Sequence, residues 1–327
     1  MVNREILLLH DAVIEGAPPD EQDTLVQVSQ IGSALRRLGC AVRTLAFDGD
    51  LSALEANLRK KPTDLLFNVV ETFHGSRFLH TIPLLCAQLG IPVTGGNASS
   101  LFLTGDKLLA KRLMVLKGIP TPRWVEDRES DAWPSFLGKT LICKPREEEA
   151  SVGITDESVF TCNTSDELRM RYDDAVRGKM ILEEYIEGRE CNISVASSGK
   201  AVHVFPIAEM VFTDYPEGKP RIVGYEAKWD EHSFAYHHTV RSFAFAQREP
   251  ALARRLEELA VSCWHLFDCT GYGRVDLRID SAGNPFVLEI NMNPCLTDDS
   301  GFIAACAQAS MSYDEAIRMI IEEALRG

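Results

Sequence analysis

Three side chains near the C-terminus carry the oxygen atoms that a hard divalent cation prefers as ligands: Asp276, Glu289 and Asn291. Asp276 lies in a predicted strand over residues 274–279, and the other two lie in a predicted strand over 285–291 after a short turn. Glu289 and Asn291 are two residues apart, so they share one face of their strand. Carboxylate and amide oxygens suit Mg²⁺ or Mn²⁺ carrying a phosphate. The alternative for any one of them is a solvated acidic hairpin.

Side chains alternate between the two faces of a strand, so the residues between the polar ones predict the apolar face of this hairpin. We expect four side chains to point away from the polar set and towards a core: Val275, Leu277, Leu288 and Ile290.

Three lysines on separate segments could bind phosphate: Lys107, Lys144 and Lys228. Lys144 ends a short apolar strand, so its ammonium group should emerge at the strand end. The loop that follows ends in Ser151, Val152 and Gly153 and could offer backbone N–H groups to phosphates. The alternative for each lysine is an ordinary solvated position.

An acidic linker over residues 182–190 joins two predicted strands. In a nucleotide site, such a linker can present backbone groups to a base and a carboxylate to ribose hydroxyls. Taken alone, it is equally compatible with a solvated acidic turn.

The composition limits the class of protein that positions these residues. The chain has 327 residues, with 34 Lys and Arg against 48 Asp and Glu, for a net charge of −14. Hydrophobic residues at 45% and charged residues at 25% are ordinary globular values and exclude a low-complexity chain. An acidic surface repels phosphate backbones, so we expect no nucleic-acid partner. The length predicts two or three domains.

The sequence also favours a cytoplasmic location without a membrane partner. No segment approaches the roughly 18 apolar residues of a membrane span, and the N-terminus lacks a signal-peptide pattern. The nine cysteines are scattered without a Cys-x-x-Cys pair, which favours reduced thiols.

The first hundred residues alternate strand and helix patterns, with strands predicted at 5–9, 42–47 and 64–70. Helices of this length between strands predict a parallel α/β layer, whose ligands gather beyond the strand ends. The first helix carries an apolar stripe: Leu25, Val28, Ile31, Leu35 and Leu38. The third strand leads to Glu71 and His74, which we expect on the substrate side of a site, although turns use the same residue types.

The remaining pattern predicts further strands and helices around these motifs. Strands are expected at 141–144 and 180–186 and from 188 to 211, and helices at 106–117, 166–176, 250–267 and 313–325. Residues 213–247 are expected to be irregular and to act as a lid.

In this order, the motifs resemble the ATP-grasp superfamily, and within it the D-alanine–D-alanine ligase group. The matching segments include Thr104–Lys107, Lys144-Pro145, Ser151–Gly153, Glu183–Glu190, Glu226–Lys228, Gly273–Asp276 and Leu288–Asn291. The resemblance implies a three-domain α/β architecture, α+β in its ATP-grasp part, with a parallel N-terminal sheet. We expect domains over 1–100, 101–186 and 187–327, and the family also implies a homodimer.

The resemblance further implies an ATP-dependent ligase that joins a small-molecule carboxylate and an amine through an acyl phosphate. By position, the phosphates would be bound by Lys107, Lys144, Ser151, Val152 and Gly153, and the nucleoside by Glu183, Tyr185, Ile186 and Glu190. Lys228 would contact the transferring phosphoryl group, Arg274 would stabilise the oxyanion and the acyl phosphate, and Ser151 would complete the catalytic set. Asp276, Glu289 and Asn291 would bind Mg²⁺ or Mn²⁺.

The substrate motifs of the group are not retained. The strand at 5–9 leads to His10-Asp11 in place of the group's Gly-Gly-x-Ser-x-Glu run, and His74-Gly75 lacks the Glu-Asp pair that follows in the group. Ala150, Trp229 and Cys295 replace a serine, a tyrosine and a glycine of the group. We therefore expect substrates other than two D-alanines.

Several alternatives stay open at this level. The chain could be a true D-alanine–D-alanine ligase, or a non-catalytic ATP-binding sensor or scaffold. The acidic run Glu147–Glu149 could attract a substrate amine or form a solvated loop, and Cys295 could be a reactive thiol or a packing residue. Cys295 and Ser300 complete the expected substrate-side set with Glu71 and His74.

Overall fold

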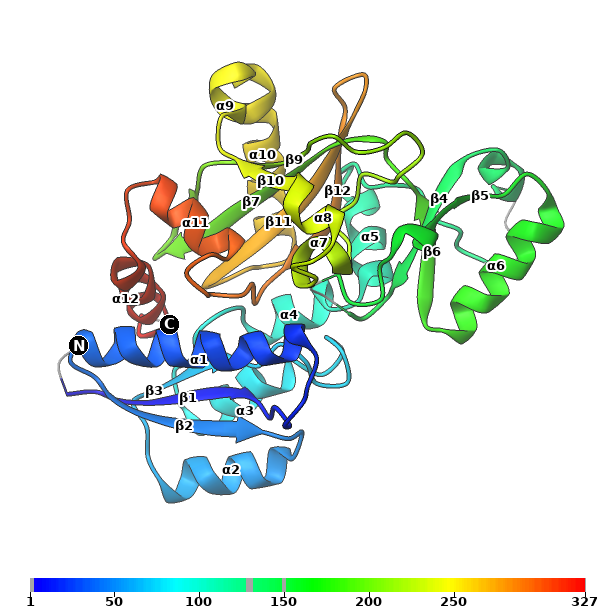
Figure 1. The fold of residues 1–327 in the computed structure, drawn as a ribbon. Helices are drawn as coiled ribbons and strands as arrows, with labels where there is room; N and C mark the ends of the chain where they lie inside the picture. Colours follow the sequence, from blue (N-terminus) through cyan, green and yellow to red (C-terminus); the bar gives the residue numbers. More distant parts are fainter. Residues whose placement is uncertain (1–2, 128–131, 149–150, 327) are drawn as a thin grey trace.

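The computed structural model describes residues 3–127, 132–148 and 151–326, in which helices surround three β-sheets (Figure 1). The predicted division at residues 100 and 186 stays a prediction. Within the described residues, no helix combines the length and apolar character needed to cross a membrane. Seven of the nine cysteines are buried.

The N-terminal sheet has three parallel strands in the order β2-β1-β3, which confirms the predicted parallel layer. Its strands are β1 (Glu5–Asp11), β2 (Ala41–Phe47) and β3 (Leu65–Val69), and its helices are α1 (Pro19–Arg37), α2 (Leu51–Lys60) and α3 (Thr81–Leu89). Every residue of β3 is buried, as is usual for a parallel strand covered on both faces. Helix α1 lies between this sheet and the rest of the molecule, and α2 lies on the opposite face (Figure 1).

The buried face of α1 differs from the predicted stripe at its N-terminal end. Leu25 is 49% exposed, whereas Thr24 and Gln27 are buried. The Gln27 side chain donates to Glu71 Oε1 (2.9 Å) and accepts from the Leu296 backbone N–H (2.8 Å). The start of α1 therefore faces a polar site and not an apolar core.

A second, small sheet is antiparallel, in the order β5-β4-β6. It comprises β4 (Thr140–Pro145), β5 (Val159–Thr161) and β6 (Met180–Glu184), covered by α6 (Ser165–Arg177). Together they form the lobe at the right of Figure 1, with an apolar cluster of its own. Strand β5 was not predicted, because three residues are too short to show alternation.

The largest sheet is antiparallel, in the order β10-β9-β7-β11-β12, with β8 paired to β7. Its strands are β7 (Gly188–Ser198), β8 (Ala201–Val204), β9 (Ala208–Phe212), β10 (Thr239–Ser242), β11 (Tyr272–Asp280) and β12 (Pro285–Asn291). Helices α4 (Ala98–Thr104) and α10 (Pro250–Leu266) contact this sheet, and α5 (Lys107–Leu116) contacts both of these helices. Helices at 106–117 and 250–267 were predicted, whereas α4 was not.

The segment 213–247 is only partly irregular, so that prediction is wrong in part. It contains three short helices and a strand: α7 (Tyr225–Trp229), α8 (Phe234–His238), β10 and α9 (Phe245–Arg248). Helices of four or five residues contain little more than one turn, so they leave no periodic pattern in the sequence.

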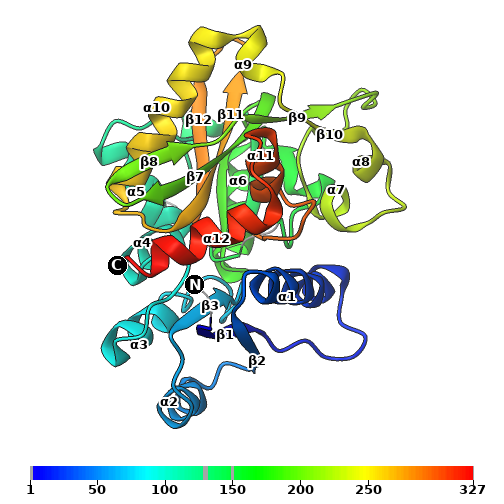
Figure 2. The ribbon, with the colours of Figure 1, turned by 90° about the vertical axis from the view of Figure 1, so that its left-hand side faces the viewer.

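Two C-terminal helices close the structure: α11 (Gly301–Gln308), which was not predicted, and α12 (Tyr313–Ala324). Helix α12 packs on α1 and contacts both β3 and β7, so it lies between the N-terminal sheet and the largest sheet (Figure 2). Its residues Ile317, Ile320 and Ile321 belong to one buried cluster with Ile31 and Leu35 of α1.

We expect Ile317→Ala to lower the free energy of unfolding by about 2–4 kcal/mol, because Ile317 is fully buried between the two sheets. Arg318→Ala, at an exposed position of the same helix, should change it by less than about 0.5 kcal/mol. Urea denaturation of both variants measures the difference. Equal effects would contradict the packing role of α12.

Candidate active site

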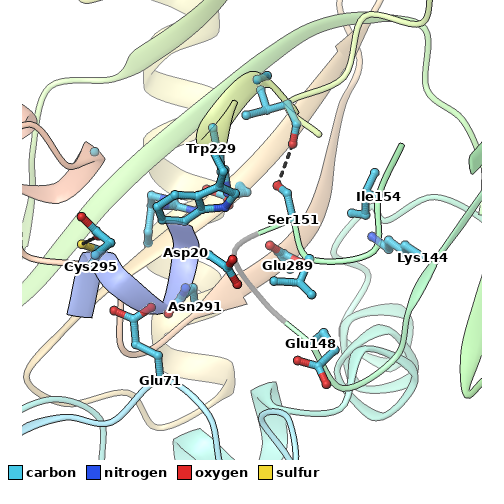
Figure 3. A pocket seen from close by; sticks show the side chains of 18 of the residues that line it. Asp20, Glu71, Lys144, Glu148, Ser151, Ile154, Trp229, Glu289, Asn291 and Cys295 are labelled. Carbon is cyan, nitrogen blue, oxygen red and sulfur yellow. Dashed lines mark hydrogen bonds and ion pairs between the residues drawn. The ribbon is translucent and has the colours of Figure 1, made fainter. Parts of the chain in front are cut away.

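A cavity of about 830 Å³ lies where the three sheets meet. Its walls come from the ends of β1 and β3, from β4 and β6, and from β7, α7, β11 and β12. Figure 3 shows that side chains from these distant segments point into one space.

Most of the predicted site residues line this cavity: Glu71, His74, Lys144, Ser151, Val152, Glu183, Tyr185, Ile186, Glu190, Lys228, Arg274, Asp276, Glu289, Asn291, Cys295 and Ser300. Lys107 and Gly153 do not line it. Lys107 nevertheless lies beside the cavity, because its Nζ is 3.3 Å from Glu289 Oε2.

The polar face of β11 and β12 brings the proposed cation ligands together. Asp276 and Glu289 are paired across the two strands, and Arg274 is paired with Asn291. Asp276 accepts two hydrogen bonds from Arg274, each 2.7 Å long, and one of 2.7 Å from Asn192 Nδ2. Within the part of the chain that the structure describes, no group of three or more His, Cys, Asp and Glu residues could hold a metal ion. Two carboxylates and the Asn291 amide remain a donor set that suits Mg²⁺.

Glu289 lies at the centre of the positive charge. Burial by itself raises the pKa of Glu289, but four cations outweigh burial and lower the pKa to about 2: Lys107, Lys144, Lys228 and Arg274. Burial, together with the neighbouring Arg274, lowers the pKa of Lys228. Cations from four separate elements therefore surround one ionised carboxylate.

A β-bulge in β12 corrects the predicted apolar face. Asp276 pairs with Glu289, but the next residue, Leu277, pairs with Val287, so Leu288 is an extra residue in its strand. Leu288 lines the cavity beside Glu289, and the fully buried Val287 takes the core position instead. The other predicted core residues, Val275, Leu277 and Ile290, are buried as expected.

A buried ion triad supports the opposite wall. Glu183 forms ion pairs with Lys144 Nζ and Lys111 Nζ, both at 2.7 Å, and all three side chains are nearly inaccessible to solvent. Burial raises the pKa of Glu183, yet the two lysines hold it below its usual value. Lys111 also donates to Thr121 Oγ1 (2.9 Å). Lys111 is not among the predicted site residues, because only the tertiary contact with Glu183 gives it a role.

The loop that was expected to cover phosphates contacts the 213–247 segment. Ser151 has a positive φ of 64°, and its hydroxyl donates to the Val223 carbonyl (2.6 Å). Of the acidic run, Glu148 lines the cavity, and Glu149 lies outside the described residues. The backbone carbonyl of Glu147 accepts a 2.7 Å hydrogen bond from the Ser76 N–H.

One residue on the wall that carries the expected nucleoside ligands (the nucleoside wall) was not predicted. Arg278 lines the cavity with Tyr185 and Glu190, is 3% exposed, and lies 3.2 Å from Glu190 Oε2. Its position two residues after Asp276 places it on the same face of the strand. That spacing could have identified it.

The N-terminal wall of the cavity is acidic. Glu71 Oε1 accepts from Gln27, and the Glu71 backbone N–H donates to Asp11 Oδ2 (2.7 Å). Burial raises the pKa of Glu71 to about 7 and that of Asp11 to about 6. These carboxylates set the charge of the wall that faces the cation-rich wall.

The three other predicted substrate-side residues border the same wall. Cys295 donates through Sγ to Asp23 Oδ2 (3.3 Å), and burial holds the pKa of its thiol well above the usual value. The His74 ring stacks on Phe73, and Ser300 caps the N-terminus of α11. A thiol with a raised pKa is a poor nucleophile, which favours the packing interpretation of Cys295.

Comparison with known proteins identifies the class of protein to which the chain belongs. The fold is that of the ATP-grasp ligases: the chain superposes on the ATP complex of D-alanine–D-alanine ligase from Bacillus anthracis with a TM-score of 0.72, at 21% identity, over 99% of this chain and 97% of that chain. The family described as "D-ala D-ala ligase C-terminus" matches residues 117–322, more than half of the chain. The chain therefore belongs to the D-alanine–D-alanine ligase family, whose members are ATP-grasp ligases forming carbon–nitrogen bonds.

Sequence identity to two relatives shows how far the chain has diverged within this family. The uncharacterized protein y4sG of Sinorhizobium fredii is 31% identical over 88% of this chain and 84% of its own length. A D-alanine–D-alanine ligase of Cupriavidus necator is 26% identical over 95% of this chain and 90% of its own length.

The raised pKa values on the acidic wall predict a pH-dependent stability. Because the folded state raises the pKa of Glu71 from 4.5 to about 7, its stabilising contribution is complete below pH 4.5 and is lost as pH rises through 7. Glu71→Gln keeps a hydrogen-bond acceptor for Gln27 without the charge. We expect the variant to gain about 1–3 kcal/mol relative to wild type at pH 8 and little at pH 4.5.

Urea denaturation at the two pH values measures this gain. The control is Glu15→Gln, since Glu15 is exposed. A difference between Glu71→Gln and wild type that is the same at both pH values would contradict the burial of an unpaired carboxyl.

Proposed function

We propose that this protein is an ATP-dependent carboxylate–amine ligase that forms an amide through an acyl phosphate, with substrates other than two D-alanines. The observation that carries the proposal is the cavity in which four cations surround Glu289, opposite a nucleoside wall and an acidic wall. Phosphoryl transfer needs mainly positioning and electrostatic stabilisation, and this arrangement offers both.

The metal ligands in this proposal are Asp276, Glu289 and Asn291. A bound Mg²⁺ or Mn²⁺ would neutralise phosphate charge. Because Arg274 already pairs with Asp276, the side chains of this corner are oriented before any ligand binds. This pairing supports a shared role of the two residues at one reacting centre.

The other polar residues act on the nucleotide and on the transferring group. Lys144 and the backbone of the loop Ser151–Gly153 bind phosphates. Lys107 pairs with Glu289 and adds to the positive charge at the phosphates. Lys228 and Arg274 stabilise the negative charge that develops on the phosphoryl group and on the tetrahedral intermediate. Glu183, Tyr185, Ile186 and Glu190 bind the nucleoside.

The substrate side supports different substrates from those named for the relatives. This side of the cavity is lined by six residues: Glu71, His74, Cys295, Ser300, Asp11 and Asp23. The substrate motifs of the ligase group are absent from the sequence. An acidic wall favours a substrate with a cationic amino group.

Two alternative functions are a D-alanine–D-alanine ligase and a non-catalytic ATP-binding sensor. Relatives named D-alanine–D-alanine ligase align over most of the chain, which favours that activity. A non-catalytic ATP-binding sensor has the same fold, but it has little need for both Lys228 and Arg274 at the metal corner.

The decisive experiment measures phosphate release from Mg-ATP with a panel of D- and L-amino acids, dipeptides and other carboxylates. We expect turnover with at least one acid and amine pair and weak turnover with D-alanine alone. Robust turnover with D-alanine alone would establish a D-alanine–D-alanine ligase. Nucleotide binding without turnover on any pair would favour the sensor.

The metal assignment predicts that Asp276→Asn and Glu289→Gln each lower turnover by about 100-fold or more, since each removes a charged ligand at the reacting phosphate. Asp280→Asn is the matched control, because Asp280 ends β11 next to the turn of the same hairpin and accepts backbone hydrogen bonds that Asn can also accept. We expect the control to retain activity within about twofold. Full activity of Glu289→Gln at all Mg²⁺ concentrations would refute the assignment.

A further inference from the structure

Arg278 is a buried cation whose contacts join three segments around the nucleoside wall. It lies on β11, lines the cavity and is 3% exposed. A buried arginine costs free energy unless its hydrogen-bonding groups are satisfied. The identity of its partners therefore indicates what the residue does.

The first group of hydrogen-bond partners of Arg278 lies at the start of β7. Arg278 faces Glu190 across the β7–β11 ladder, and its Nη1 is 3.2 Å from Glu190 Oε2. Its Nη2 donates to the Gly188 carbonyl at 3.0 Å. Both bonds fix the start of β7, where Glu190 enters the cavity.

The second group holds Tyr185 and the 213–247 segment. The guanidinium lies over the Tyr185 ring, 4.9 Å from its centroid, and Nη1 donates to the Arg221 carbonyl at 2.7 Å. The Tyr185 hydroxyl donates to the same carbonyl at 3.1 Å. Arg278 thus ties the 182–190 linker to the segment above the cavity.

The remaining N–H group of Arg278 points to a role beyond structure. Its Nε is buried and has no hydrogen-bond partner. An apolar side chain of similar length would fill this position without leaving a polar atom unsatisfied. The guanidinium is instead placed where it can hold the Glu190 carboxylate in one orientation.

We propose that Arg278 is a positioning residue for the nucleoside, acting through Glu190 and Tyr185. The inference rests on the proposed function, because it takes this wall to be the ATP site. With Arg278 in place, the Glu190 carboxylate is held ready to accept hydrogen bonds from ribose hydroxyls. Arg278 therefore sets both the affinity for ATP and the preference for a nucleotide with a complete ribose.

The test compares the binding of ATP and 2′-deoxy-ATP to wild type, Arg278→Met and Arg278→Lys by isothermal titration calorimetry. We expect Arg278→Met to bind ATP about tenfold or more weakly and to lose most of the discrimination against 2′-deoxy-ATP. Arg278→Lys should recover part of both, because a lysine can still pair with Glu190 but lacks the planar fork. Where phosphate release is measurable, KM for ATP should rise with little change in kcat.

Two further variants separate positioning from stability. Arg189→Met is the matched control: Arg189 is adjacent to Glu190 on β7 but pairs with Glu249, so nucleotide affinity should not change. In a Glu190→Gln background, Arg278→Met should not reduce the ribose discrimination further, because the two residues act together. Thermal unfolding of each variant identifies any loss of folding, in which case Arg278→Lys decides the question.

The outcomes that overturn the inference differ from those that overturn the ligase function. Unchanged affinity and discrimination in Arg278→Met, additive effects of the two substitutions, or failure of wild type to bind ATP would each refute the positioning role. ATP binding by wild type without phosphate release on any substrate pair would refute the ligase function, and the binding measurements would still judge Arg278.

Discussion

The cavity depends on keeping buried cations paired with buried carboxylates. Glu183 joins Lys111 and Lys144 behind one wall, and Glu289 gathers cations from four elements at another. Removing one partner of such a set leaves an uncompensated charge in a medium of low polarity, which costs several kcal/mol. The attraction between Lys144 on β4 and Glu289 on β12 therefore links the two antiparallel sheets by charge.

This pairing explains how an acidic chain can form a site for an anion. The net charge of −14 is spread over the surface, whereas the lysines and Arg274 converge on one cavity. The carboxylates among them hold the cations in place and leave the wall positive in sum. On the opposite wall, burial outweighs the backbone and side-chain hydrogen bonds of Glu71 and Asp11, so the pKa values of both carboxyl groups are raised. Within the described residues, these two carboxyl groups have no set of cations comparable to that around Glu289.

Much of the fold and of the ATP side of the cavity was predictable from local pattern. The N-terminal strands, the hairpin of β11 and β12 and the long helices follow from apolar periodicity, which is a property of neighbouring residues. Short elements such as β5, α7 and α8 were missed because each contains little more than one structural period, which is too short to show a repeating pattern. The substrate wall was less predictable, since it combines segments such as Gln27 and Glu71 that only the folded chain brings together.

The sequence by itself determined the oxygen donors of Asp276, Glu289 and Asn291, because residue type fixes the donor atoms and a two-residue spacing places Glu289 and Asn291 on one strand face. Only the tertiary structure decided the bulge that turns Leu288 into the cavity and the partners of Arg278. Both depend on how distant strands are paired and which loops cross above them, and a register between distant segments is set by the packing of the whole fold.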